Sequence, residues 1–203
     1  MTTLWLIRHS APTAAFLRES RCYGVFDVPL DYSHFSETAA RLRRLLPPTS
    51  ALIASPRDRC QKLARAIRTI DAAPFITDAR IAEMDFGRWE NVRWGDVPRT
   101  ELDAWAADFW GYRAHGGESV FGFVTRVKAA LVDAITRQPS DETVWVTHQG
   151  VIRSVRALTG EGGLKRLAEV AGIGFGETIE LRLDESLVHP IESSWREVAQ
   201  QFA

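Results

Sequence analysis

The chain has 203 residues, a length that suits one domain, and 45% of them are hydrophobic, enough for a packed core. Its 25 basic and 26 acidic side chains give a net charge of −1, which excludes the basic surface of a nucleic-acid or anionic-membrane binder. The two cysteines, Cys22 and Cys60, exclude a disulfide framework. We find neither a secretion leader nor an apolar run of membrane-spanning length, so we expect a cytoplasmic protein.

Strand and helix patterns alternate along the chain. Short apolar runs predict strands at 4–8, 51–55, 75–77, 143–147 and 177–183. Helical spacing of apolar residues predicts helices at 36–46, 55–70, 100–110, 118–135, from 149 to just before 160, and at 163–171. Ser36 and Ser55 are the expected N-caps of the first two helices, with Pro56 at the first helical position of the second. The tail after residue 183 gives no clear pattern.

This alternation favours an α/β fold: a three-layer α/β/α sandwich with a mostly parallel central sheet. Residues 83–117 interrupt the rhythm, and we interpret them as a small cap insertion that covers one end of the sheet. Residues 1–203 therefore form one domain with a cap at 83–117.

Cationic side chains follow three of the predicted strands. Arg8 and His9 end the first strand, Arg59 lies on the first turn after the second, and His148 and Gln149 follow "TVWVT". Ligands of open α/β sheets bind beyond the carboxyl ends of the strands, where helix N-termini also attract anions. Because guanidinium groups bind phosphate oxygens in a bidentate fork, the sequence predicts a phosphate site at this edge.

Other chemistries lack their signals. Neither cysteine begins a Cys-x5-Arg phosphate loop, and no spacing of His, Cys or Asp predicts a metal site. The G-x-S-x-G, G-x4-G-K-[ST] and G-x-G-x-x-G patterns are also missing. We interpret His34 and His189 as structural or surface groups rather than catalysts, and His115 stays undecided.

Six blocks in order resemble the histidine phosphatase (phosphoglycerate mutase-like) superfamily. They are "LIRHS", "CYGVFDVPL", "ASPRDRCQKLA", "AEMDFGRWE", "GGESV" and "VTHQGVIR". The resemblance implies that His9 is the nucleophile, that Arg8 and Arg59 bind the phosphoryl oxygens, and that His148 helps to hold the transferring group. It further implies Glu83 as general acid and base, and a hydrogen bond from the backbone N–H of Gln149. It implies no metal and no other cofactor.

The departures from the family pattern concern substrate contacts. Ser10 stands where glycine is usual, "SAPT" replaces a T-x-W-N continuation, and Gln149 and Asn91 replace glycines. The resemblance places Ser10, Cys22, Tyr23, Gly24 and Trp89 around the substrate.

Several segments most resemble the α-ribazole phosphatase branch, which implies removal of phosphate from α-ribazole 5′-phosphate in cobalamin nucleotide-loop assembly. The alternatives are a broad-specificity phosphatase of sugar phosphates or nucleotides, phosphoglycerate mutase-like transfer, and a non-catalytic phospholigand-binding regulator. The cap aromatics either pack the cap onto the sheet or form a wall for a flat ligand. The expected partner is a small phosphate ester, with no nucleic acid and no membrane; a homodimer is left open.

Overall fold

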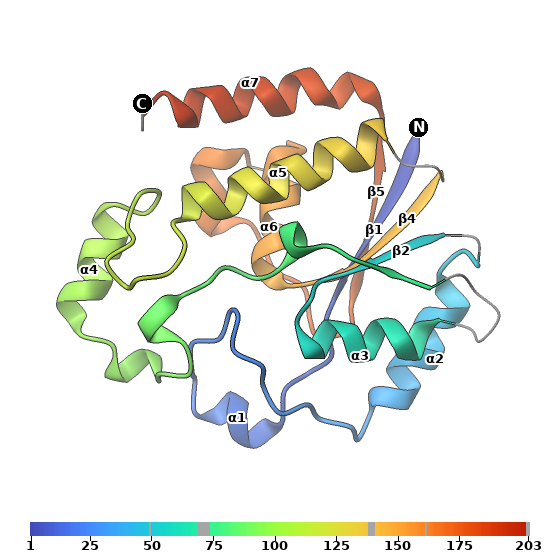
Figure 1. The fold of residues 1–203 in the computed structure, drawn as a ribbon, viewed down its shortest axis with the longest axis horizontal. Coiled ribbons are helices and arrows are strands. Elements are labelled where there is room, and N and C mark those ends of the chain that lie inside the picture. The colour runs from blue at the N-terminus through green and yellow to red at the C-terminus, as the bar shows by residue number, and fades with distance from the viewer. Residues whose placement is uncertain (49, 69–73, 138–140, 161, 202–203) are drawn as a thin grey trace.

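The central sheet has five strands in the order β3–β2–β4–β1–β5 (Figure 1). The computed structural model describes residues 1–48, 50–68, 74–137, 141–160 and 162–201. The strands are β1 Thr2–Arg8, β2 Ala51–Ala54, β3 Ile76–Thr77, β4 Glu142–Thr147 and β5 Thr178–Leu183. All neighbours pair in parallel except β5, which runs antiparallel to β1. The mostly parallel sheet predicted from the sequence is confirmed.

Helices cover both faces of this sheet (Figure 1). On one face lie α2 Phe35–Leu45 and α3 Asp58–Ile67; on the other lie α5 Val120–Thr136, α6 Gln149–Leu158 and α7 Val188–Ala199. Alternation along the strands builds both cores: Leu4, Leu6 and Trp145 join the α5–α6–α7 side, and Ile7, Val144 and Val146 join the α2–α3 side. The three-layer sandwich is therefore confirmed.

The cap lies on the side toward which β1 runs (Figure 1). It contains the short 3₁₀ turns Gly87–Trp89 and Trp94–Asp96 and the helix α4 Arg99–Ala107. The short helix α1 Ala14–Arg18 lies beside it in the view of Figure 1. Cys22, Trp89, Val97 and Tyr112 form a separate small core inside this cap.

Two predicted N-caps are wrong. Helix α2 begins at Phe35 after His34, so Ser36 lies within its first turn. Helix α3 begins at Asp58 with Arg57 as its N-cap, so Ser55 and Pro56 both precede the helix. The Ser55 hydroxyl accepts from Arg57 N at 3.3 Å and is bonded to the ring of His148, 2.7 Å away. The predicted helix ran to residue 70; α3 ends at Ile67, and residues 69 and 70 lie outside the described residues.

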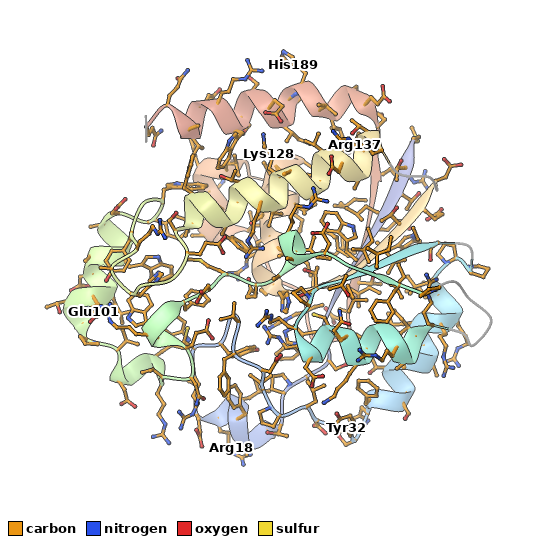
Figure 2. All side chains as sticks on the ribbon, in the orientation of Figure 1. Arg18, Tyr32, Glu101, Lys128, Arg137 and His189 are labelled. Atoms are coloured by element: carbon orange, nitrogen blue, oxygen red, sulfur yellow. The ribbon has the colours of Figure 1, made fainter. Side chains whose placement is uncertain are left out.

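The bounds of other helices and strands differ by a few residues from those predicted. The helix expected at 163–171 is a kinked 3₁₀ segment, Leu164–Glu169. Helix α7 lies in the tail for which no element was predicted. It packs on α5 through stacked rings of Phe121 and Trp195, and Lys128 Nζ donates to Glu192 Oε1 at 2.7 Å. In Figure 2 Lys128 lies between α5 and α7, whereas His189 points outward from α7. His34 and His189, interpreted from the sequence as structural or surface groups, are both exposed. Within the described part of the chain, no helix is long and apolar enough to cross a membrane.

Candidate active site

The carboxyl ends of β1 and β4 and the first turn of α3 bring three cation-capable side chains together. The rings of His9 and His148 have centroids 5.3 Å apart, and Arg59 Nη2 lies 3.1 Å from His148 Nδ1. All three side chains are buried, with at most 2% of their surface exposed. The parallel register explains this placement, since Arg8 pairs with Thr147 and the next residues leave the sheet at one edge.

His9 is held as a neutral imidazole with one defined tautomer. Its Nδ1 lies 2.8 Å from the carbonyl oxygen of Ser10, which can only accept, so Nδ1 carries the proton and Nε2 keeps its lone pair. Burial, and then the nearby Arg59 guanidinium, lower the pKa of His9 well below its usual 6.5. A buried imidazole with a free Nε2 lone pair is suited to nucleophilic attack.

His148 has the opposite tautomer. Because a guanidinium only donates, Nδ1 of His148 accepts from Arg59, and Nε2–H donates to the Ser55 hydroxyl at 2.7 Å. Burial and the charge of Arg59 lower the pKa of His148 well below 6.5. The ring therefore orients Arg59 from one side and is itself fixed by Ser55, a residue whose role the sequence did not reveal.

Arg59 is anchored by main-chain oxygens. Its Nη1 donates to Phe26 O at 2.8 Å and its Nη2 to Gly24 O at 2.5 Å, while the Tyr23 ring lies 5.4 Å from its guanidinium carbon. Its Nε is buried and has no partner among the described residues. The guanidinium is thus fixed in place with unused hydrogen-bond capacity.

Arg8, the residue before His9, shows the same pattern. Its Nη1 donates to Ile173 O at 2.8 Å, and its guanidinium carbon lies 3.8 Å from the centroid of the Phe175 ring. Its Nε and the Ser10 hydroxyl are also buried without a partner in the described chain. Buried polar groups are rarely left unpaired, so these donors around His9 fit an anionic ligand.

Glu83 is fixed by two backbone amides, one at the start of α6 and one in the residue that follows Glu83. Gly150 N–H donates to Oε2 at 3.0 Å and Met84 N–H to Oε1 at 3.1 Å. Arg126 of α5 holds the chain that carries Glu83, donating to the carbonyls of Ala82 at 2.7 Å and Glu83 at 3.0 Å. Arg126 was not recognised from the sequence, because main-chain acceptors leave no motif.

A cavity of about 310 Å³ opens beside Glu83. Glu83, Gly150 and Ser154 contribute to its wall. Most of the wall is formed by apolar and aromatic side chains, namely Met84, Phe86, Trp105, Phe109, Val120, Phe123, Leu167 and Ala168. Arg153 of α6 also lines it, and the Arg153 Nε is buried without a partner among the described residues. The cavity can take an apolar or flat group and offers one cation.

Comparison with protein families matches residues 4–185 to the histidine phosphatase superfamily (branch 1). The chain belongs to this superfamily. A comparison with curated proteins found no match.

Solved structures of other proteins share the fold. An α-ribazole phosphatase from Shigella flexneri superposes with a TM-score of 0.78 at 24% identity, covering 91% of this chain and 92% of that chain. A mycobacterial glucosyl-3-phosphoglycerate phosphatase, solved with VO3, gives 0.72 at 20% identity, covering 90% and 93%. TTHB049 from Thermus thermophilus gives 0.67 at 26% identity, covering 89% and 93%.

The remaining residues expected around the substrate of this histidine phosphatase divide into two groups. Ser10 and Tyr23 lie beside His9, with the Tyr23 and His9 ring centroids 6.3 Å apart, and Gly24 contributes a carbonyl to Arg59. Cys22 and Trp89 are instead buried in the cap core and do not line the cavity. Trp89 is stacked on Tyr112 and bonded through Nε1 to Glu101 Oε2 at 2.7 Å, which fixes it as a packing residue. Among the cap aromatics, Trp89 packs in the small core, whereas Trp105 and Phe109 line the cavity.

Gln149 begins α6, so its backbone N–H lies at a helix N-terminus. Its side chain, in contrast, binds the backbone near residues 172 and 173. Its Oε1 accepts from Ile173 N at 3.2 Å, and its amide lies against Gly172, where an added Cβ would fall 1.5 Å from Gln149 Nε2. His115, undecided from sequence, lies in the cap beside Trp89, with ring centroids 4.8 Å apart.

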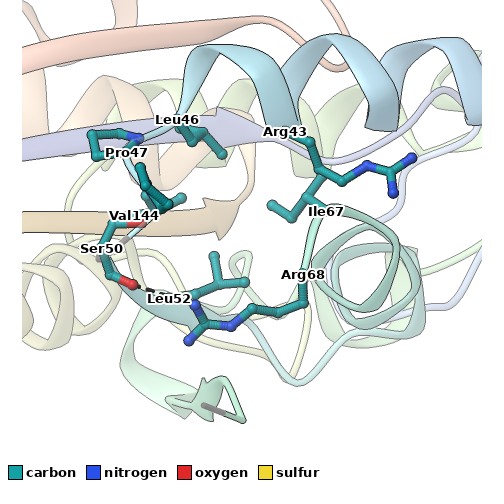
Figure 3. A pocket seen from close by; sticks show the side chains of 9 residues that line it. Arg43, Leu46, Pro47, Ser50, Leu52, Ile67, Arg68 and Val144 are labelled. Carbon is teal, nitrogen blue, oxygen red and sulfur yellow. Dashed lines mark hydrogen bonds between the residues drawn. The ribbon is translucent and has the colours of Figure 1, made fainter. Parts of the chain in front are cut away.

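A second pocket, shown in Figure 3, lies at the opposite end of the strands. Its volume is about 80 Å³, and Ser50, which precedes β2, accepts from Arg68 Nη1 there at 3.3 Å. Figure 3 shows the Arg43 side chain extending away from Ser50. This pocket shares no residue with the site around His9.

We predict opposite neutral tautomers for the two histidines. In ¹⁵N NMR spectra of the free protein, His9 should be protonated at Nδ1 and His148 at Nε2. Because both pKa values lie well below 6.5, both rings should stay neutral at pH 6.5, where an ordinary imidazole is half protonated. An imidazolium spectrum for His9 at that pH, or a proton on its Nε2, would contradict the geometry.

We also predict that Gly150→Ala displaces Glu83. A Cβ at this position would lie 2.2 Å from Glu83 Oε1, so the carboxyl must move and lose its bond from the amide of residue 150. Turnover should fall about 10²-fold, as expected for misplacing a reacting group by an ångström. Gly95→Ala is the control, since nothing lies within 4 Å of its added Cβ. Equal activity of both variants would show that the close approach of Gly150 to Glu83 is unimportant.

Proposed function

We propose that the protein is a metal-independent phosphomonoesterase that works through a phosphohistidine at His9. One observation carries the proposal: a buried, neutral His9 with a free Nε2 lies close to Arg8 and Arg59, whose buried Nε donors lack partners among the described residues. A phosphate dianion would satisfy these donors and place phosphorus against Nε2.

The first half-reaction follows from this arrangement. Nε2 of His9 attacks phosphorus in line, the P–O ester bond breaks, and the two arginines stabilise charge on the equatorial oxygens. Positive charge builds on the imidazole, and the Nδ1–H bond to Ser10 O stabilises it. Glu83, in its protonated form, donates its proton to the departing alkoxide, so the alcohol leaves neutral.

The second half-reaction returns the enzyme to its starting state. Glu83, now a carboxylate, takes a proton from water as that water attacks phosphorus, and the P–N bond to His9 breaks. His148 takes no proton in this scheme, because both of its ring nitrogens are engaged, by Arg59 and by Ser55. Its part is to hold Arg59.

The first candidate substrate is α-ribazole 5′-phosphate, whose flat benzimidazole base suits an aromatic wall. The cavity beside Glu83 supports it with Phe86, Trp105, Phe109 and Phe123. The structural similarity to an α-ribazole phosphatase is consistent with this candidate but does not establish the substrate.

A second candidate class is the phosphate esters of acidic alcohols, such as a phosphoglycerate. Arg153 favours it, because a guanidinium in a mostly apolar wall with an unpartnered Nε would be paired by a carboxylate. This class agrees with the glucosyl-3-phosphoglycerate phosphatase among the structural neighbours.

Hydrolysis of a panel of phosphate esters in EDTA tests both the proposed mechanism and the proposed substrates. We expect p-nitrophenyl phosphate to be hydrolysed in EDTA and the activity to be lost in His9→Ala. Glu83→Gln should slow esters with poor leaving groups by ~10²–10⁴-fold, and activated esters less. Loss of activity in EDTA would overturn the metal-free mechanism. Phosphate binding without turnover of any ester would favour a phospholigand-binding regulator.

The same panel separates the two substrate candidates. If α-ribazole 5′-phosphate is the substrate, its kcat/KM should exceed those of phosphoglycerate and glycerol phosphate. If an acidic ester is the substrate, phosphoglycerate should be preferred over glycerol phosphate, and Arg153→Gln should remove that preference alone.

A further inference from the structure

We propose that Glu90, a cap residue, is a positioning residue for Arg59, acting through the peptides of residues 24–26. The inference rests on the proposed function, in which Arg59 binds the transferring phosphoryl group. Through Glu90, the cap would contribute to phosphate binding as well as to the wall of the cavity beside Glu83.

The carboxylate of Glu90 binds the backbone N–H groups of the loop formed by residues 24–26. Its Oε2 accepts from Gly24 N at 2.9 Å and Phe26 N at 3.0 Å, and its Oε1 accepts from Val25 N at 3.0 Å. Oε1 also accepts from Phe86 N at 3.0 Å, in the segment that follows Glu83. Successive backbone amides of this kind form an anion-binding nest, here occupied by the protein's own carboxylate.

The C=O side of the same loop binds two arginines. Gly24 O and Phe26 O accept from Arg59, and Val25 O accepts from Arg57 Nη1 at 2.8 Å. The C=O of Gly24 and the N–H of Val25 belong to one planar trans peptide, so they point in opposite directions. This single peptide therefore joins the Glu90 carboxylate on one side to the Arg59 guanidinium on the other.

The link has a physical consequence for Arg59. A carboxylate at the N–H end polarises the peptide and strengthens acceptance at its carbonyl. It also fixes the orientation of the peptide plane, and with it the direction from which Arg59 is held. Because Arg59 is 1% exposed, water cannot replace a carbonyl that turns away.

Close packing leaves the loop little freedom to reach Arg59 in another way. A Cβ on Gly24 would lie 1.7 Å from Met84 O, so the loop lies directly against the chain next to Glu83. Glu90 thus connects the phosphate-binding arginine with the segment that carries the proposed general acid.

The experiment removes the carboxylate and returns it in solution. Glu90→Ala leaves a carboxylate-sized space surrounded by four amide donors, so kcat/KM should fall about 10²-fold and recover in part on addition of formate. Glu90→Gln, which is isosteric, should lose activity without recovery, and it carries the test if the alanine variant does not fold. Glu101→Ala is the matched control, because Glu101 is a cap carboxylate that binds Trp89 and Arg88 and does not contact the loop.

A double-mutant cycle shows whether Glu90 acts through Arg59. In an Arg59→Ala background, Glu90→Ala should cost far less than in the wild type. Full additivity of the two losses, or a formate response equal to that of Glu101→Ala, would overturn the proposal.

Binding of orthovanadate, measured by calorimetry on the same variants, separates this inference from the proposed function. If the wild type hydrolyses no ester, the proposed function fails, but Glu90 is still tested. Weakened vanadate binding in Glu90→Ala that formate restores would support its role, and unchanged binding would overturn it.

Discussion

The buried guanidinium of Arg59 is the charge around which the site is organised. A cation with 1% of its surface exposed must be compensated inside the protein, and the carbonyls of Gly24 and Phe26 do part of this. Asp27 Oδ1 also lies 3.6 Å from Arg59 Nη1, and the contact of Arg59 to Nδ1 of His148 fixes that ring as a neutral acceptor. The field of Arg59 also lowers the pKa of His9. The acceptor tautomer of His148 follows from this one charge at the edge of the sheet, and the same charge adds to burial in keeping His9 neutral.

The fold provides the edge at which this charge can be placed. Parallel pairing of β1 with β4 and of β4 with β2 carries His9, His148 and the start of α3 to the same side of the sheet. The cap then adds the parts that strand ends cannot supply. It contributes Glu83 beside the start of α6, an aromatic wall from Phe86, Trp105 and Phe109, and the Glu90 carboxylate on the loop that holds Arg59.

The sequence predicted those parts of the fold and of the site that depend on residue types recurring in a local pattern. Short apolar runs predicted the strands, and the cations that follow them predicted the edge at which the site lies. It was less informative where a contact joins distant segments. Ser55 has the spacing of a helix cap, yet its hydroxyl bonds His148, 93 residues away. Arg126 binds main-chain carbonyls, and Phe175 stacks under Arg8 from a loop; neither arrangement requires a recognisable motif. Trp89 and Cys22 lie within motif blocks but are buried in the cap core.

The central claim is that phosphate is transferred through Nε2 of His9, because Ser10 O binds Nδ1–H and leaves only Nε2 available. The most direct measurement is NMR of ¹⁵N-histidine-labelled enzyme trapped with substrate by rapid quenching into base, which preserves phosphohistidine. The structure predicts a one-bond ³¹P–¹⁵N coupling to Nε2 of His9. Coupling to Nδ1, phosphate on any other residue, or turnover without a trapped phosphoenzyme would contradict it.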